Sequence, residues 1–143
     1  MLILGIETSC DETSAAIVKN GREVISNEIA TSLNFHKKFG GIVPEIASRV
    51  QLETIVQVTD NAVKKANVSL KDIGLIAVTH EPGLSGSLLV GTSFSKSISL
   101  SLNVPLLTVN HVLSHIYANF LDCRDQSFRL LHDRCRYGSS AIK

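Results

Sequence analysis

Residues 2–18 read LILGIETSCDETSAAIV, and this stretch indicates how the fold begins. Two short apolar runs, at residues 2–6 and 15–18, flank a segment of carboxylates and hydroxyls. Apolar runs of this length bounded by polar residues are typical of strands, so the stretch predicts two strands joined by a polar loop. The Asn-Gly pair at residues 20–21 favours a hairpin turn, and residues 23–30 are rich in β-branched side chains. We therefore expect three antiparallel strands at the start of the chain.

Helical and strand patterns alternate in the next part of the chain. Residues 44–66 carry apolar side chains at helical spacing, which predicts a helix. Residues 73–79 form a nearly continuous apolar run, typical of a buried strand. In residues 85–102 serines alternate with larger side chains, which taken literally is a strand pattern; we interpret it as a helix, because small serines can line a close helix-packing surface. Residues 106–109 and 111–121 predict a final strand and a third helix. The predicted apolar face of the first helix comprises Leu52, Ile55, Val56, Ala62, Val63 and Ala66.

This order of elements predicts an α/β fold. Three strands come first, and strands and helices then alternate, so the second half should be joined by parallel crossovers. The expected result is a mixed five-stranded sheet with three helices. That is the arrangement of a ribonuclease-H-like lobe.

Composition excludes several classes of protein. The chain has 143 residues, is 44% hydrophobic and carries a formal net charge of +1. One domain with a core is expected, and the charge gives no global reason to bind nucleic acid or an anionic membrane. The sequence contains no apolar stretch of 18 or more residues, so it predicts no membrane span. Three cysteines without a CxxC pair favour a reducing compartment, so we predict a cytoplasmic protein.

The last twenty residues differ from the rest of the chain. Residues 1–123 hold 9 basic and 11 acidic side chains, whereas residues 124–143 hold 5 basic and 2 acidic ones. Only a brief apolar piece interrupts this polar segment. We therefore divide the chain into a lobe at residues 1–123 and a divergent, poorly ordered tail at residues 124–143.

The polar loop at residues 7–13 is the first candidate site. A tight turn can offer backbone N–H groups and hydroxyls to phosphate oxygens, while carboxylates hold a divalent cation or order a water molecule. A plain polar hairpin loop is the alternative on spacing alone. The segment and the residue that follows it contain the carboxylates Glu7, Asp11 and Glu12 and the hydroxyls Thr8, Ser9, Thr13 and Ser14.

His111 and His115 are the second candidate site. Histidines four residues apart on a helix share one face, so both imidazoles can bind one metal ion if a third ligand comes from elsewhere. Position 112 is valine, which excludes the HExxH metalloprotease pattern. Two half-buried structural histidines are the alternative on spacing alone.

Four motifs in register give the chain a specific resemblance. They are GIETSCDET at residues 5–13, GGIVPEIASR at 40–49, PGLSGSLLVG at 82–91 and NHVLSH at 110–115. With these motifs the chain resembles the tRNA N6-adenosine threonylcarbamoyltransferase family, formerly called the O-sialoglycoprotein endopeptidase or glycoprotease family. The resemblance covers roughly residues 2–123, which would be the N-terminal lobe of a two-lobed protein.

The resemblance implies a fold and a reaction. The fold is that of the actin-like ATPase and sugar kinase superfamily, in which two ribonuclease-H-like lobes face a nucleotide cleft. The reaction transfers a threonylcarbamoyl group from threonylcarbamoyl-adenylate to N6 of the adenosine next to the anticodon (position 37), in tRNAs reading codons that begin with adenine. Implied partners are tRNA, a shorter paralogue and an ATPase, the proteins docking through helices of this lobe.

The resemblance also implies roles for individual residues. His111 and His115 would be two ligands of one divalent metal ion, with iron(II) favoured over zinc. Asp11 and Glu12 would be catalytic and would lie near the adenylate phosphate. Thr8, Ser9 and Thr13 would bind substrate phosphate, with Mg²⁺ as a possible companion of the adenylate.

The chain departs from the family pattern after Cys123. The Ser-Gly-Gly-His-Thr phosphate loop does not follow, and the C-terminal lobe and the aspartate that would complete the metal site are absent from this sequence. We therefore expect that this chain alone binds metal weakly and does not catalyse the transfer. One alternative is an inactive interaction module similar to the helper paralogue, and another is an actin-like ATPase. Neither alternative accounts for the histidine pair.

Overall fold

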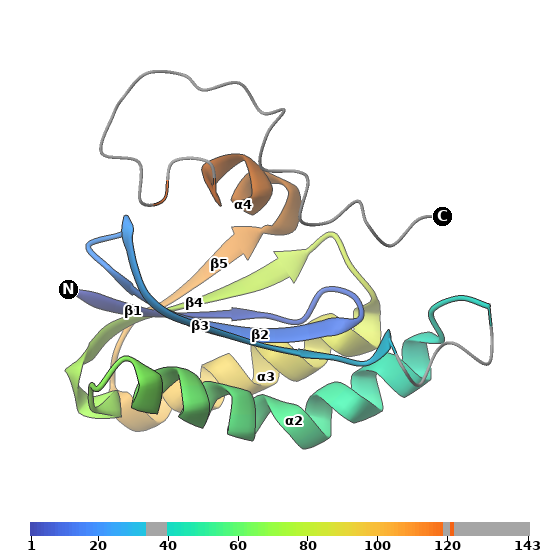
Figure 1. Ribbon diagram of the computed structural model, residues 1–143, viewed down its shortest axis with the longest axis horizontal. Coiled ribbons are helices and arrows are strands. Elements are labelled where there is room, and N and C mark those ends of the chain that lie inside the picture. The colour runs from blue at the N-terminus through green and yellow to red at the C-terminus, as the bar shows by residue number, and fades with distance from the viewer. Residues whose placement is uncertain (34–39, 119–120, 122–143) are drawn as a thin grey trace.

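One five-stranded mixed sheet organises the protein (Figure 1). The computed structural model describes residues 1–33, 40–118 and 121, so the predicted tail at residues 124–143 lies outside the described residues. The sheet order is β3-β2-β1-β4-β5, with the first three strands antiparallel and β4 and β5 parallel to β1. The strands are β1 (Leu2–Glu7), β2 (Glu12–Lys19), β3 (Glu23–Thr31), β4 (Ile73–Glu81) and β5 (Leu106–Asn110). The predicted three antiparallel strands and the five-stranded sheet are confirmed.

Two long helices cover one face of the sheet, and a short helix lies on the other side (Figure 1). The long helices are α2 (Pro44–Lys65) and α3 (Ser85–Leu102), and the short one is α4 (His111–Tyr117). A 3₁₀ turn, η2 (Leu70–Asp72), precedes β4. The described residues thus contain the three predicted α-helices. The serine-rich segment is the helix that we expected, and its small residues Ser87, Gly91 and Ser95 are buried.

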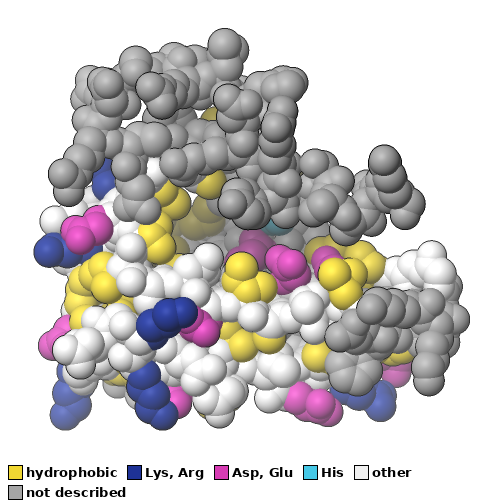
Figure 2. Space-filling model, viewed as in Figure 1, with side chains coloured by type: hydrophobic (Ala, Val, Ile, Leu, Met, Phe, Trp, Pro, Cys, Tyr) yellow, Lys and Arg dark blue, Asp and Glu magenta, His cyan; other side chains and the backbone are white. Residues whose placement is uncertain are grey.

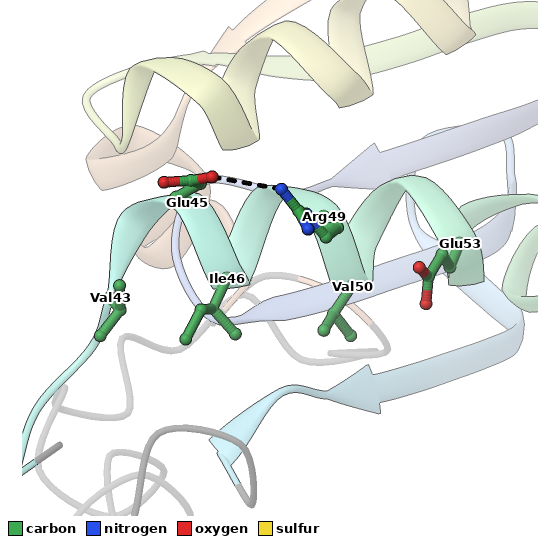
Figure 3. A pocket seen from close by; sticks show the side chains of 6 residues that line it. All are labelled: Val43, Glu45, Ile46, Arg49, Val50 and Glu53. Atoms are coloured by element: carbon green, nitrogen blue, oxygen red, sulfur yellow. Dashed lines mark hydrogen bonds and ion pairs between the residues drawn. The ribbon is translucent and has the colours of Figure 1, made fainter. Parts of the chain in front are cut away.

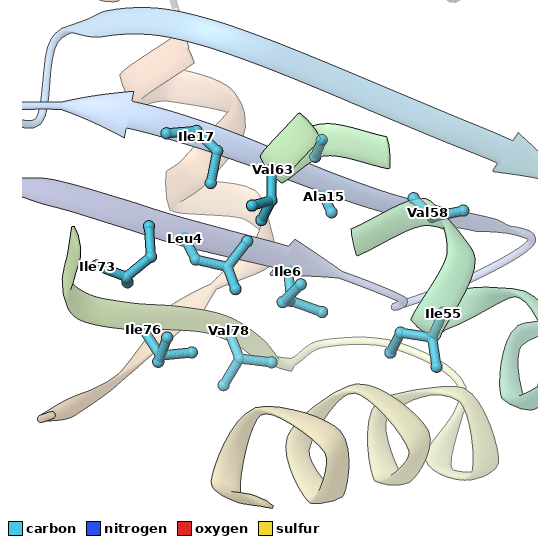
Figure 4. Packing of buried hydrophobic residues seen from close by; sticks show 11 residues of the cluster. Leu4, Ile6, Ala15, Ile17, Ile55, Val58, Val63, Ile73, Ile76 and Val78 are labelled. Atoms are coloured by element: carbon cyan, nitrogen blue, oxygen red, sulfur yellow. The ribbon is translucent and has the colours of Figure 1, made fainter. Parts of the chain in front are cut away.

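The hydrophobic core lies between the sheet and the two long helices (Figure 4). Leu4, Ile17 and Ile76 are fully buried strand residues, and Ile55 and Val58 pack on them from α2. Buried and more exposed positions alternate along the strands, because successive side chains of a strand point to opposite faces of the sheet.

The predicted apolar face of α2 was partly wrong. Leu52 and Val56 are 65% and 62% exposed, whereas Gln51 and Thr59 are buried. The buried positions follow one stripe of the helix, and Leu52 and Val56 come directly after the stripe residues Gln51 and Ile55, turned about 100° away from them toward the outer side. Leu52 and Val56 therefore form part of the outer surface of α2. The buried residues of α2 are Ala47, Gln51, Ile55, Val58, Thr59, Ala62 and Val63.

Thr59 provides a test of the packing between α2 and the sheet. Its hydroxyl is buried and has no hydrogen-bond partner among the described residues. Since a buried polar group without a partner is costly, Thr59→Val should raise the free energy of unfolding by about 1 kcal/mol. Urea denaturation would measure the change. A lower denaturation midpoint in the variant would contradict the packing described here.

Candidate functional site

The carboxyl ends of three neighbouring parallel strands meet at one edge of the sheet. Glu7 is the last residue of β1, and Asn110 is the last residue of β5, with β4 between the two strands. Crevices at the carboxyl ends of parallel strands are the usual binding sites in open α/β sheets. This edge therefore brings the loop after β1 next to the histidine pair that follows β5.

The histidine pair is placed by a capped helix start. The Asn110 side chain accepts hydrogen bonds from the N–H groups of Val112 (3.0 Å) and Leu113 (3.2 Å), so α4 begins at His111. One turn later comes His115, and the Nε2 atoms of the two imidazoles are 3.1 Å apart. The rings are nearly perpendicular, with an interplanar angle of 88°. Both Nε2 atoms therefore converge on one point in space.

Glu7 joins the histidine pair to the loop. His111 Nδ1 lies 3.1 Å from Glu7 Oε2 and 3.1 Å from Ser9 Oγ, and the Ser9 N–H donates to Glu7 Oε1. Burial would raise the pKa of Glu7, but hydrogen bonds from Ser9, Thr79 and His111 outweigh it and hold the pKa below its ordinary value. Glu7 is then an anion that accepts the Nδ1 proton of His111. That tautomer directs the Nε2 lone pair of His111 toward His115.

In the loop between β1 and β2, the backbone carbonyls turn inward. The carbonyl of Ser9 accepts from the Leu84 N–H (2.8 Å), and that of Asp11 accepts from the N–H (2.9 Å) and hydroxyl (2.8 Å) of Ser32. Gln51 donates to the carbonyls of the other three residues of this segment. All five carbonyls from residue 8 to residue 12 are thus bonded to the protein interior. The remaining acceptors are Thr8 O (3.3 Å), Cys10 O (3.0 Å) and Glu12 O (3.0 Å), all bonded to Gln51 Nε2.

The structure places two of the three predicted phosphate-binding hydroxyls inside the protein. Thr8 is fully buried and donates to the carbonyl of Ser87 (2.8 Å), while Thr13 is 2% exposed and lies 3.3 Å from the Thr54 hydroxyl. Both hydroxyls thus have hydrogen-bond partners inside the protein. Of the three predicted phosphate-binding residues, only Ser9 lies against the histidine pair.

Asp11 and Glu12 lie on the chain directly before and at the start of β2. Strand β2 begins at Glu12, three residues earlier than predicted, so the loop proper is shorter than the sequence suggested. No group of three or more His, Cys, Asp or Glu side chains among residues 1–33, 40–118 and 121 is arranged to hold a metal ion. Neither carboxylate therefore completes the histidine pair within this part of the chain.

The donor set of the pair fits two positions of a metal site. Two imidazole nitrogens bound to one tetrahedral zinc ion lie about 3.3 Å apart. The observed 3.1 Å between the Nε2 atoms matches this spacing. The contact of His111 with Glu7 also matches a common arrangement, in which a metal-binding histidine donates its other N–H to a carboxylate.

The Cys10 thiol gives a prediction about the charge of this loop. Burial raises the pKa of Cys10, and the neighbouring Asp11 carboxylate raises it further. Because only the thiolate reacts, iodoacetamide should modify Cys10 several-fold more slowly in the folded chain than in the urea-unfolded chain. Asp11→Asn should speed the reaction of the folded chain. Mass spectrometry of the Cys10 peptide would measure both rates, and equal rates in the wild type and the variant would contradict the proximity of the carboxylate.

A separate concave surface lies on α2 (Figure 3). It is lined by residues of the helix start, and its Glu45 and Arg49 side chains form an exposed ion pair of 3.2 Å. None of the predicted site residues lines it. In the space-filling view, by contrast, acidic side chains and a histidine lie near one another in the middle of the visible face (Figure 2). The contacts of His111 with Glu7 and Ser9 place the candidate site at the sheet edge.

Sequence reasoning missed the roles of Glu7 and Gln51. Glu7 stood out only as one of three carboxylates in the loop, because nothing in local spacing links it to His111, which is 104 residues away. Gln51 gave no signal, since a polar residue on an amphipathic helix is ordinarily solvated. Its burial depends on the loop that packs over it.

Comparison with solved structures supports the fold. YeaZ from Pseudomonas aeruginosa superposes with a TM-score of 0.62 at 17% sequence identity, covering 83% of this chain and 50% of that chain. The Thermus thermophilus RuvC chain, solved in complex with a Holliday junction substrate, gives a TM-score of 0.51 at 10% identity and covers 82% of this chain and 68% of that chain. At these identities the likeness concerns the fold alone. It supports the predicted α/β fold, a mixed five-stranded sheet with helices of a ribonuclease-H-like lobe.

Comparison of sequences shows the family. The family model described as "tRNA N6-adenosine threonylcarbamoyltransferase" matches residues 23–131. A relative of that name from Bacillus subtilis is 55% identical over 121 residues, which cover 85% of this chain and 35% of the relative. Another from Fusobacterium nucleatum is 51% identical over 122 residues, which cover 85% and 36%. The chain thus spans little more than a third of the length of these relatives. By the family match, this chain belongs to the tRNA N6-adenosine threonylcarbamoyltransferase family.

Proposed function

We propose that this chain supplies the N-terminal half of a site that transfers a threonylcarbamoyl group from threonylcarbamoyl-adenylate to N6 of the adenosine next to the anticodon (position 37) of tRNA. The observation that carries the proposal is the contact of His111 with both Glu7 and Ser9, which joins the histidine pair to the loop. The recipient tRNAs are those reading codons that begin with adenine. In this proposal the rest of the site comes from a C-terminal lobe, so this chain alone does not catalyse the transfer.

The loop is proposed to face the phosphate of the adenylate. With the carbonyls of residues 8–12 bonded inward, the opposite sides of these peptide planes carry N–H groups. That of Ser9 donates to Glu7, and those of Cys10, Asp11 and Glu12 suit an anion. Thr8 and Thr13 support the loop from inside the protein, through the hydrogen bonds of their hydroxyls. In our proposal, Ser9 contributes a hydroxyl, and Asp11 and Glu12 are the catalytic carboxylates, which order the amine of the attacking adenosine or a Mg²⁺ ion that accompanies the adenylate.

The histidine pair is proposed to hold one divalent metal ion, with iron(II) favoured over zinc. When bound, such an ion polarises a carbonyl and neutralises charge on a phosphate leaving group. His111 and His115 would hold it through their Nε2 atoms. Glu7 would keep the proton of His111 on Nδ1, so that Nε2 is free for coordination.

The outer surface of the two long helices is proposed to contact the partner proteins. Leu52 and Val56 on α2 and Leu89 on α3 are large apolar side chains that are at least 62% exposed. Such a surface suits a protein partner, here a shorter paralogue that works with an ATPase. No described helix is apolar enough over sufficient length to cross a bilayer. A cytoplasmic location remains a prediction from the cysteine content.

Ligand binding by the loop tests the proposed function directly. AMP carries the adenosine and phosphate of the adenylate, and its titration into ¹⁵N-labelled chain should shift the amide signals of Ser9, Cys10, Asp11 and Glu12. Signals at the start of β3, near Glu23 and Val24, lie at the opposite end of the strand pair from the loop and should stay in place. Shifts spread evenly over the chain, or none at saturating AMP, would contradict the proposal.

Glu7 gives a prediction for metal affinity. Glu7→Gln removes the negative charge that fixes the His111 proton on Nδ1, so the affinity for Zn²⁺ should fall by about 10-fold. Isothermal titration calorimetry would measure it. Glu53→Gln, which changes an exposed carboxylate on α2, should leave the affinity unchanged. Equal affinities for wild type and Glu7→Gln would show that Glu7 does not act on His111.

A further inference from the structure

Gln51 is a fully buried polar side chain that points from α2 into the loop between β1 and β2. We propose that Gln51 is a positioning residue of the candidate site, which holds this loop with its carbonyls inward and its N–H groups outward. The inference rests on the proposed function only in assigning a phosphate to the outer side of the loop. The geometry itself is independent of the substrate.

One amide nitrogen serves three carbonyls. Gln51 Nε2 lies 3.3 Å from Thr8 O, 3.0 Å from Cys10 O and 3.0 Å from Glu12 O. Three acceptors around one atom require a donor, so the NH₂ group and not the amide oxygen must face the loop. Its two hydrogens are shared among three acceptors at every second residue of the loop. The side chain therefore acts as a single clamp on alternate peptide planes.

The intervening carbonyls are held by other elements. Leu84 donates its N–H to Ser9 O, and Ser32 donates its N–H and hydroxyl to Asp11 O. Gln51 holds the alternate planes, of which that of Cys10 also accepts from the Ser87 hydroxyl (3.3 Å) while Gln51 is the donor to Thr8 O and Glu12 O. In a trans peptide the N–H of one residue points opposite to the carbonyl of the residue before it. Fixing the carbonyls of Thr8 and Cys10 therefore directs the N–H groups of Ser9 and Asp11.

One of the N–H groups on the outer side of the loop already has an acceptor, at Ser9. The Ser9 N–H that opposes the Thr8 carbonyl donates to the Glu7 carboxylate, the same carboxylate that contacts His111. Gln51 therefore reaches the histidine pair through a chain of three hydrogen-bonded groups. A clamp on the loop also positions the carboxylate that orients His111.

Packing alone does not explain a glutamine at this position. Its Oε1 is buried and has no hydrogen-bond partner among the described residues, which is an energetic cost. Methionine has a similar length and shape and would fill the same space without this cost. We therefore expect that the NH₂ donor group, and not the shape of the side chain, accounts for a glutamine at this position.

The test compares Gln51→Met with Thr59→Val in the full 143-residue chain. Both substitutions remove a buried polar group from α2, but the Thr59 hydroxyl has no partner among the described residues. A carbonyl carbon signal moves upfield when the oxygen loses a hydrogen bond. In Gln51→Met the carbonyl carbons of Thr8, Cys10 and Glu12 should move upfield, and those of Ser9 and Asp11 should move much less. Thr59→Val should move none of the five.

Amide exchange provides a second measurement on the same samples. Because the loop loses its clamp, the amide hydrogens of Leu84 and Ser32 should exchange about tenfold faster in Gln51→Met, beyond any change in global unfolding. A merely space-filling role would change the global stability but neither the alternating pattern nor these two amides. Unchanged carbonyl signals, or equal movement at all five positions, would overturn the proposal.

The outcome does not depend on ligand binding. A wild-type chain that bound no AMP would contradict the proposed function, while the carbonyl pattern would still decide the role of Gln51. If Gln51→Met does not fold, the side-chain amide hydrogens of wild-type Gln51 decide instead. They should exchange at least tenfold more slowly than those of Gln57, which is exposed on the same helix. Exchange at the rate of Gln57 would overturn the proposal.

Discussion

Replacing Gly91 with alanine is expected to lower the free energy of unfolding by about 3 kcal/mol. A Cβ atom at position 91 would lie 2.3 Å from the hydroxyl oxygen of Thr8, far inside van der Waals contact. This oxygen is buried and donates to the carbonyl of Ser87, so it cannot move without leaving the buried Thr8 hydroxyl unpaired. Urea denaturation followed by circular dichroism would measure the loss.

Gly86→Ala provides the matched control on the same helix. A Cβ atom there would lie 3.2 Å from the Ser48 side chain, at an exposed position where a small movement relieves the contact. Its effect should stay below about 1 kcal/mol, because alanine is also the better helix former. In the double variant Gly91→Ala/Thr8→Ala the overlap disappears, so its loss should be smaller than the sum of the single losses. Equal effects of Gly91→Ala and Gly86→Ala would contradict the close packing of α3 on the loop.

The second large effect is expected for the histidine pair. His111→Ala or His115→Ala removes one of the two imidazoles whose Nε2 atoms lie 3.1 Å apart. Loss of a hydrogen-bond partner of a metal ligand lowers metal affinity by roughly 10- to 100-fold, and loss of the ligand itself should lower the Zn²⁺ affinity by more than that. Calorimetry with the 143-residue chain would measure this, starting from a weak wild-type affinity because the third ligand is not among the described residues.

His80→Ala is the control for non-specific metal binding. His80 is exposed near the carboxyl end of β4, its Nε2 lies 3.6 Å from Glu81 Oε1, and it is not part of the histidine pair. Its replacement should leave the affinity unchanged. A Zn²⁺ affinity that falls equally in all three variants, or in none, would show that the pair is not a metal site.

Much of the fold followed from the sequence because local patterns and overall topology agree. The apolar runs of β1 and β4 and the helix starting at Pro44 were found from periodicity and end signals, whereas the serine-rich helix α3 was predicted against its literal strand-like alternation. The exposure of the Leu52 and Val56 side chains was not predicted. An amphipathic stripe predicts which residues share a face, but a buried glutamine in that stripe shifts the apparent centre of the apolar face.

The candidate site was predictable only in its separate pieces. The histidine pair is a local pattern on one helix, so its spacing was readable from the sequence. The contact between His111 and Glu7 depends on strands β1, β4 and β5 lying side by side, which no local spacing encodes. The burial of Thr8 and Thr13 was missed for the same reason, since the residues that bond to them belong to α3 and α2.

The most direct test of the central claim is a chimera with an intact relative. The 121-residue matched segment of the Bacillus subtilis relative is replaced with the corresponding residues of this chain, and formation of N6-threonylcarbamoyladenosine in tRNA is measured from threonylcarbamoyl-adenylate. The account predicts that the chimera forms the modified nucleoside and that His111→Ala in it lowers the rate by at least about 100-fold while the chimera stays folded. A folded chimera without activity, or one that keeps its rate after His111→Ala, would contradict the claim.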